Sequence, residues 1–154
     1  MGTTICGIKL MLVHISGGVT CALKYDASNF GCTYPGFGGK PMVYVTDGKG
    51  KSLEHVIVPQ NHEDKDKLGG YNLTGYTHES PFLVFDLPCY YCFNKGVKYN
   101  LWYGEDLLDV YEDDNGDDTA YTDIYICPIS EGLYHSRLRY YQGPQHLCDN
   151  NCMS

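Results

Sequence analysis

The sequence has few charged residues and no stretch dominated by basic ones. Only 19% of its 154 residues are charged, whereas 43% are hydrophobic and 14% aromatic. A disordered chain or a coiled coil needs more charge and fewer rings, so both classes are excluded. No basic stripe is present to neutralise phosphates, which excludes nucleic acid as the main partner. No apolar run approaches the roughly 20 residues that cross a bilayer, so no membrane span is predicted.

Catalytic motifs are also missing from the sequence. The chain contains no G-x-S-x-G turn, no phosphate-binding glycine loop and no H-E-x-x-H pair, and its six histidines have no paired metal spacing. Solvated Asp clusters are poor general acids, because nothing around them raises a pKa. We therefore expect a protein that is not an enzyme.

The chain is rich in short β-type runs separated by Gly, Asn and Asp turn signals such as YPGFGGKP, DGKGK and KLGG. Convincing helical periodicity with caps is lacking, and EGLYHSRLRYY near the end suits a helix or a strand equally. The sequence predicts an all-β fold, a disulfide-stabilised antiparallel β-sandwich of about eight strands. The eight runs are ICGIKLMLVHI, VTCALKYD, PMVYVTD, LEHVIVP, YNLTGYT, PFLVFDL, VKYNLWYG and AYTDIYICPI.

The length is that of one domain. The part beyond residue 129 differs in composition, with little aliphatic content and two closely spaced cysteines. We predict a β-sandwich domain over residues 1–129 and a C-terminal extension or arm over 130–154.

Eight cysteines are several times what a reduced cytosolic domain usually carries, and their even number suits disulfides in an oxidising compartment. The sequon at Asn72 agrees with a secreted, extracellular glycoprotein. The cysteines are Cys6, Cys21, Cys32, Cys89, Cys92, Cys127, Cys148 and Cys152.

Other interpretations of some cysteines are open. Cys89-Tyr-Tyr-Cys92 has a redox spacing, although its flanks lack the helix that such a pair needs. Cys89, Cys92, Cys148 and Cys152 would together suit a zinc site. A disulfide between Cys148 and Cys152 would hold the end of the chain in place. Alternatively, these cysteines would form disulfides with a second chain.

Negative charge is concentrated in one stretch. Residues 105–123 contain nine carboxylates and no Lys or Arg, whereas the rest of the chain has ten acidic and eleven basic residues, so the net charge of −8 originates there. Calcium binds roughly six to eight oxygen atoms, which carboxylates converging from a turn and a loop would supply. The stretch predicts a calcium site outside the EF-hand register, with a solvated acidic loop as the alternative. The predicted ligands are Glu105, Asp106, Asp109, Glu112, Asp113, Asp114 and Asp123.

The segment LWYGEDLLDVYEDDNGDDTAYTDIY resembles a stretch of secreted and skeletal organic matrix proteins of corals and sea anemones. There a Trp-Tyr-Gly-Glu-Asp-Leu turn, here residues 102–107, is followed by an acidic Asp-Asn-Gly loop, here 114–116, and a strand ending in Asp-Val-Tyr, here 123–125. The resemblance covers about residues 70–129 and implies an extracellular, matrix-associated module. Those proteins often have a cysteine just before the Asp-Val-Tyr ending, which this chain lacks, so no disulfide pairing is carried over.

Aromatic residues give a second kind of candidate site. Fifteen tyrosines are an excess that suits strand faces, protein interfaces and sugar stacking. Trp102 and Tyr103 directly precede the acidic stretch, where they would bind a pyranose beside the carboxylates. The alternative is that Trp102 is a core ring covering one end of the sandwich.

Two functions follow from these observations. The first is a secreted, non-enzymatic structural or interaction protein, a matrix, fibre or adhesive component that associates with itself or with other matrix proteins, with calcium stabilising the acidic loop. The second is a calcium-dependent, lectin-like module that binds glycans. The cysteine-bearing tail and the tyrosine excess favour the first.

Overall fold

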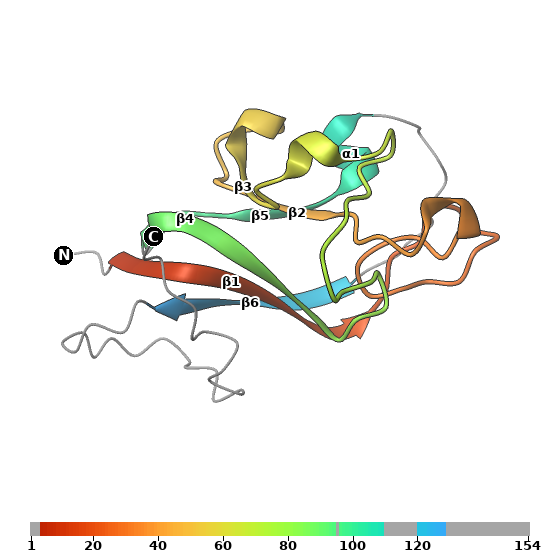
Figure 1. Cartoon of the computed structure of the whole chain (residues 1–154), viewed down its shortest axis with the longest axis horizontal. Helices are drawn as coiled ribbons and strands as arrows, with labels where there is room; N and C mark the ends of the chain where they lie inside the picture. The colour runs from red at the N-terminus through yellow and green to blue at the C-terminus, as the bar shows by residue number, and fades with distance from the viewer. Residues whose placement is uncertain (1–3, 95, 110–119, 129–154) are drawn as a thin grey trace.

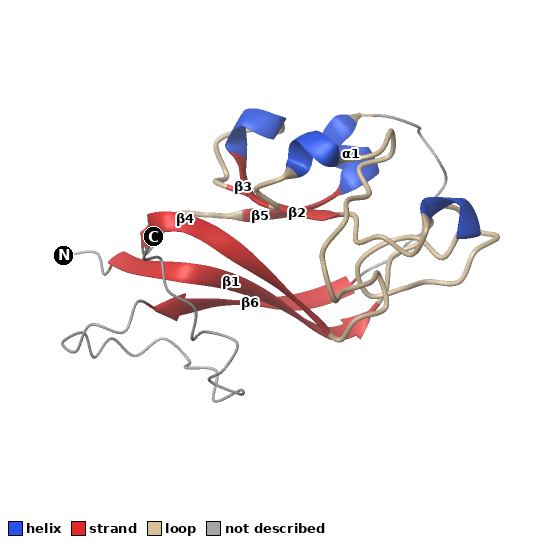
Figure 2. Cartoon of the chain, viewed as in Figure 1, coloured by secondary structure: helices blue, strands red, loops and turns tan. Residues whose placement is uncertain are grey.

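The computed structural model describes residues 4–94, 96–109 and 120–128, which form two three-stranded antiparallel sheets (Figure 1). Helix in these ranges is limited to short segments beside the strands (Figure 2). The predicted fold class, a disulfide-stabilised antiparallel β-sandwich, is confirmed. The elements are β1 Thr4–Gly17, η1 Pro35–Phe37, β2 Val43–Thr46, η2 Leu53–His55, β3 Val56–Val58, η3 His62–Asp64, β4 Phe82–Asn94, β5 Asn100–Tyr103, α1 Gly104–Leu108 and β6 Ala120–Pro128.

β1 is the central strand of the first sheet, in the order β4-β1-β6. Successive side chains of a strand point to opposite faces, so Leu10 and Leu12 share the face that enters the core. They lie opposite Phe85 and Leu83 of β4, which are also buried. Ile126 of β6 packs against the same core from the other side of β1.

β2 is the central strand of the second sheet, in the order β3-β2-β5. Its four residues are all buried, which explains why VYVT is a continuous run of β-type residues without polar alternation. In the pairing with β5, Tyr44 lies opposite Trp102 and Val43 lies opposite Tyr103. The helix α1 follows β5 without a loop, so α1 begins at the end of the second sheet.

Tyr71 joins the two sheets through the core. Its fully buried ring lies 5.4 Å from the ring of Tyr44 on β2 and 6.2 Å from that of Phe85 on β4, measured between centroids. The Tyr71 hydroxyl donates to the carbonyl oxygen of Val43 at 2.6 Å, and the Tyr44 hydroxyl donates to that of Gly69 at 2.6 Å. Burial raises the pKa of both hydroxyls, so they remain neutral donors.

Two of the predicted strands are wrong. VTCALKYD and YNLTGYT form turns, and Val19 makes only an isolated bridge with Ser28. These runs contain buried residues, including Cys21 and Tyr71, but the burial comes from loops that pack onto the core. LEHVIVP is a strand only over Val56–Val58.

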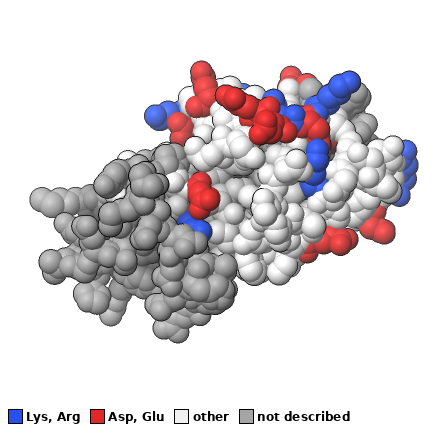
Figure 3. Space-filling view, viewed as in Figure 1, with Lys and Arg blue, Asp and Glu red and all other residues white. Residues whose placement is uncertain are grey.

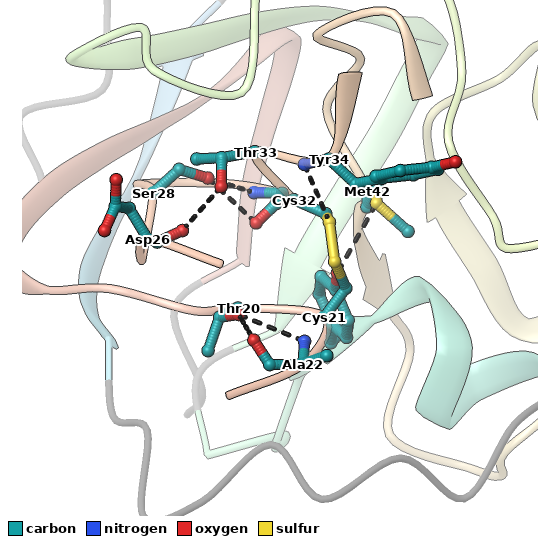
Figure 4. Close-up of a disulfide and its surroundings, with 11 residues drawn as sticks. Thr20, Cys21, Ala22, Asp26, Ser28, Cys32, Thr33, Tyr34 and Met42 are labelled. Carbon is teal, nitrogen blue, oxygen red and sulfur yellow. Dashed lines mark hydrogen bonds between the residues drawn. A yellow bond between two sulfur atoms is a disulfide. The ribbon is translucent and has the colours of Figure 1, made fainter. Parts of the chain in front are cut away.

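Two disulfides lie within the described residues. Cys6 on β1 bonds to Cys92, its directly opposed residue on β4, and Cys21 bonds to Cys32 in the loop region after β1 (Figure 4). Because Cys92 is bonded to Cys6, the interpretations of Cys92 as half of a redox pair with Cys89 or as a zinc ligand are wrong. The side chains outside the described part are those of Cys89, Cys127, Cys148 and Cys152.

The predicted arm, residues 130–154, lies outside the described residues, so the division at residue 129 stays a prediction. Among the described helices, none has the length and apolar character needed to cross a membrane.

Candidate functional site

The loop before Tyr71 lies directly against the start of α1. A Cβ atom added to Gly104 would be 3.1 Å from the Cα of Gly69, and one added to Gly69 would be 2.8 Å from the Cα of Gly104. Gly69 also has a φ of +86°, which side-chain-bearing residues rarely adopt. The two glycines therefore bring residues 66–70 beside the acidic first turn of α1.

Asp66 is held in one orientation within this loop. Its Oδ1 accepts hydrogen bonds from the backbone N–H groups of Leu68 at 3.0 Å and Gly70 at 2.8 Å. Its Oδ2 lies 3.4 Å from the Nζ of Lys40, and the side chains of Lys40 and Asp66 are 29% and 27% exposed. The Asp66–Lys40 pair is therefore a preorganised acceptor and donor that a ligand can reach.

Tyr103 lies at the end of β5, close to the Asp66–Lys40 pair. Its hydroxyl donates to the Sδ of Met42 at 3.5 Å. Burial raises the pKa of this hydroxyl, and the negative charges of Glu105, Asp106 and Asp66 raise it further. Tyr103 is therefore a neutral group in a locally negative field.

Two of the predicted metal ligands lie on α1, and a third directly follows it. Glu105 is buried and Asp106 is exposed in its first turn, where carboxylates interact favourably with the helix N-terminus. Asp109 ends the helix at a φ of 55°, and its Oδ1 lies 3.7 Å from the Nζ of Lys51. Figure 3 shows acidic side chains gathered beside basic ones over the part of the molecule that holds α1 and the second sheet.

Of the other predicted metal ligands, only Asp123 belongs to the described residues, and it does not lie on the same sheet as β5 and α1. Asp123 lies on β6, in the first sheet, where it accepts a hydrogen bond from the Tyr125 hydroxyl at 3.2 Å. In the part of the chain that the structure describes, no three His, Cys, Asp or Glu side chains are arranged to hold a metal ion. Glu112, Asp113 and Asp114 fall outside that part, so the calcium site stays a prediction.

Trp102 is half-buried and packs against the main core. This position agrees with the alternative interpretation of Trp102 as a core ring. Its Nε1 donates to the Oγ1 of Thr46 at 3.1 Å, and the Nζ of Lys51 lies 5.7 Å from the ring centroid. Sugar binding at this ring would therefore require Lys51 to move. Asn72, the predicted glycosylation site, is exposed, and its modification stays a prediction.

Asp47, at the end of β2, makes the stability of this sheet sensitive to acid. Its pKa is lowered because the backbone N–H of Lys49 donates to Oδ1 at 2.9 Å, and because the Nδ1 of His55 lies 3.2 Å from the same oxygen. A lowered pKa in the folded state gives stability above the unfolded pKa of about 4, which is lost as the pH falls through the folded value.

We expect the melting temperature of Asp47→Asn to lie below that of the wild type at pH 7. The difference should shrink as the pH falls from about 4 through the lower pKa of the folded state, because the Asp47 carboxyl is then protonated and, like the amide, neutral. Melting curves recorded from pH 7 to pH 2 measure it. A difference that stays constant over this range would contradict the role of the Asp47 charge.

The Asp66–Lys40 pair was missed by the sequence reasoning, which treated KLGG only as a turn. The hydrogen bonds of Asp66 within its own loop could have been predicted, because an Asp side chain often accepts a hydrogen bond from the backbone N–H two residues later in a turn. The lysine partner, 26 residues earlier, has no sequence signal.

No protein-family model matches this sequence, and no curated protein matches it. The structure is similar to that of AJLec from the sea anemone Anthopleura japonica, with a TM-score of 0.61 and 26% sequence identity. The similarity covers 79% of this chain and 79% of that chain. AJLec is by its name a lectin.

Proposed function

We propose that this protein is an extracellular, lectin-like module that binds glycans. The observation that carries the proposal is the similarity to AJLec over most of both chains, in fold and in sequence. The two disulfides suit an oxidising, extracellular location.

The polar groups beside α1 suit sugar hydroxyls. Each hydroxyl both donates and accepts hydrogen bonds, so it is matched by a carboxylate next to an amine. Asp66 and Lys40 provide this combination in a fixed geometry, and the exposed carboxylate of Asp106 adds an acceptor nearby. Groups that are already fixed lose little conformational entropy when a ligand binds.

We further propose that glycan binding depends on calcium. The support is the uncompensated negative charge of residues 105–123, whose carboxylates are the kind of ligand that calcium binds. The predicted structural role in a matrix or fibre, with self-association, stays a prediction. Among the described residues, no contact supports it.

A panel of immobilised neoglycoconjugates tests the proposed function. The panel presents galactose, glucose, mannose, N-acetylglucosamine and fucose, and binding is measured by biolayer interferometry in calcium and in EDTA. We expect at least one conjugate to bind and the free sugar to compete, with weaker binding in EDTA. Absence of sugar-competed binding on every conjugate in both buffers would reject the function, and equal binding in both buffers would reject calcium dependence alone.

Asp66→Asn and Asp86→Asn form a matched pair for this assay. The Asp66→Asn side chain retains an oxygen for the two backbone donors but loses the charge that attracts Lys40, so we expect weaker glycan binding with a nearly unchanged melting temperature. Asp86 is 88% exposed on β4 in the first sheet, and its substitution should leave binding unchanged. Equal effects of the two substitutions would contradict a site at Asp66.

A further inference from the structure

Aromatic side chains gather on the surface at the end of the molecule formed by residues 21–40. The ring of Tyr34 lies 5.2 Å from that of Tyr25 and 5.1 Å from that of Phe37, the latter pair nearly perpendicular. Tyr34 is 41% exposed. The Nζ of Lys24 lies 5.0 Å from the Tyr25 centroid, and the Tyr25 and Phe37 side chains are partly buried, so Tyr34 is the most open of the three rings. We refer to Tyr25, Tyr34 and Phe37 as the aromatic surface.

The loop holds the aromatic surface in place. Cys21 and Cys32 are bonded beneath it, and the backbone N–H of Tyr34 donates to the Sγ of Cys32 at 3.3 Å (Figure 4). A side chain at Gly36 would overlap the Tyr34 ring, so the glycine allows that ring to lie against the backbone of η1. Exposed rings fixed in this way suit ligand binding, because little side-chain entropy is lost when a ligand stacks on them.

The aromatic surface is connected to the Asp66–Lys40 pair. Phe37 and Tyr25 pack against a small buried cluster formed by Cys21, Cys32 and Met42, and so do Leu68 and Tyr103 from the loop and strand beside Asp66. The backbone N–H of Lys40 donates to the carbonyl oxygen of Phe37, so the Lys40 side chain starts from the backbone directly beside that ring and ends at Asp66. The loop of residues 21–40 therefore supplies the rings and the amine, and the loop of residues 66–70 supplies the carboxylate.

We infer that the aromatic surface and the Asp66–Lys40 pair form one sugar-binding site, in which a neutral pyranose stacks on Tyr34 while its hydroxyls contact Asp66 and Lys40. This inference rests on the proposed glycan-binding function. A pyranose has an apolar C–H face and a polar rim, and the two parts of the site match them. A purely apolar partner would remove water from Asp66 and Lys40 without replacing the hydrogen bonds that they make to solvent, which costs free energy.

The charges around the site define the class of sugar. Asp66 is paired with Lys40, and the carboxylates of Glu105 and Asp106, in the first turn of α1 beside Gly69, outnumber the Lys24 amine over the Tyr25 ring. Like charges repel, and the repulsion is strongest at low ionic strength. The site therefore favours neutral sugars over sialylated or sulfated ones.

The test compares Tyr34→Ala, Tyr34→Phe and Tyr121→Ala on the tightest-binding neoglycoconjugate of the panel. Tyr121 is the matched control, because it is 62% exposed on β6 in the first sheet. Loss of the Tyr34 ring should weaken binding by about tenfold, as expected for one stacked aromatic contact. Tyr34→Phe keeps the ring and should bind within about twofold of the wild type, as should Tyr121→Ala.

Melting curves and light scattering accompany each titration. An unchanged melting temperature with weakened binding in Tyr34→Ala supports the inference, and a sialylated or sulfated version of the same conjugate should bind less well. If the wild type binds no conjugate, the proposed function fails and the inference fails with it. If the wild type binds and Tyr34→Ala binds equally well, the inference alone is overturned. A change of molecular mass in Tyr34→Ala with equal sugar affinity also overturns it, because the surface would then serve contact between copies of the chain.

Discussion

Removal of the Cys6–Cys92 disulfide is expected to lower the free energy of unfolding by about 4 to 5 kcal/mol. The bond closes a loop with a sequence separation of 86, and the entropy that a crosslink removes from the unfolded chain grows with loop length. The Cys21–Cys32 bond has a separation of 11 and is expected to contribute about 3 kcal/mol by the same reasoning.

Equilibrium urea unfolding of two double variants measures this difference. Cys6→Ala with Cys92→Ala should be the less stable variant, and Cys21→Ala with Cys32→Ala the more stable one. Counting free thiols in each variant controls for rearranged disulfides. An equal or reversed order of stability would contradict the loop-length argument.

The two disulfide variants should also differ in function. Cys21→Ala with Cys32→Ala loosens the loop that holds Tyr34, so sugar affinity should fall even where the protein is fully folded. The Cys6–Cys92 bond lies in the first sheet, between β1 and β4, and its loss should leave the affinity unchanged below the melting transition.

Replacement of Tyr71 by alanine is expected to cost about 3 to 5 kcal/mol, as for other large aromatic side chains removed from a core. The ring is fully buried between Tyr44 and Phe85, which belong to different sheets, so its removal leaves a cavity where the sheets meet. Tyr71→Phe retains the ring and leaves the carbonyl oxygen of Val43 without its donor, with an expected cost of about 1 to 3 kcal/mol.

Urea unfolding at pH 7 and at alkaline pH separates the two contributions of Tyr71. The raised pKa means that the folded state favours the neutral hydroxyl. The stability is therefore fully present below about pH 10, the ordinary tyrosine value, and is lost as the pH rises above it and the unfolded chain ionises. Tyr71→Phe should lose less stability than the wild type between about pH 9 and pH 11. A cost of Tyr71→Ala no larger than that of Tyr71→Phe would show that the ring does not support the core.

The strand pattern was the most predictable part of the fold, because it depends on side chains that alternate within one segment. Leu10 and Leu12 lie on one face of the first strand, and the buried run at 43–46 is continuous because both of its faces are covered. The same reasoning failed at YNLTGYT, where Tyr71 has strand-like chemistry but is buried by a loop.

The amino-acid sequence was enough to predict the class of the fold, the presence of disulfides and the concentration of negative charge in residues 105–123. These properties follow from composition and from the periodicity of neighbouring residues. The pairing of Cys6 with Cys92 and of Asp66 with Lys40 could be seen only in the folded protein. The physical reason is that these contacts join residues far apart in the chain, and their geometry depends on how two sheets pack and on two glycines, Gly69 and Gly104, that allow a loop and a helix to meet.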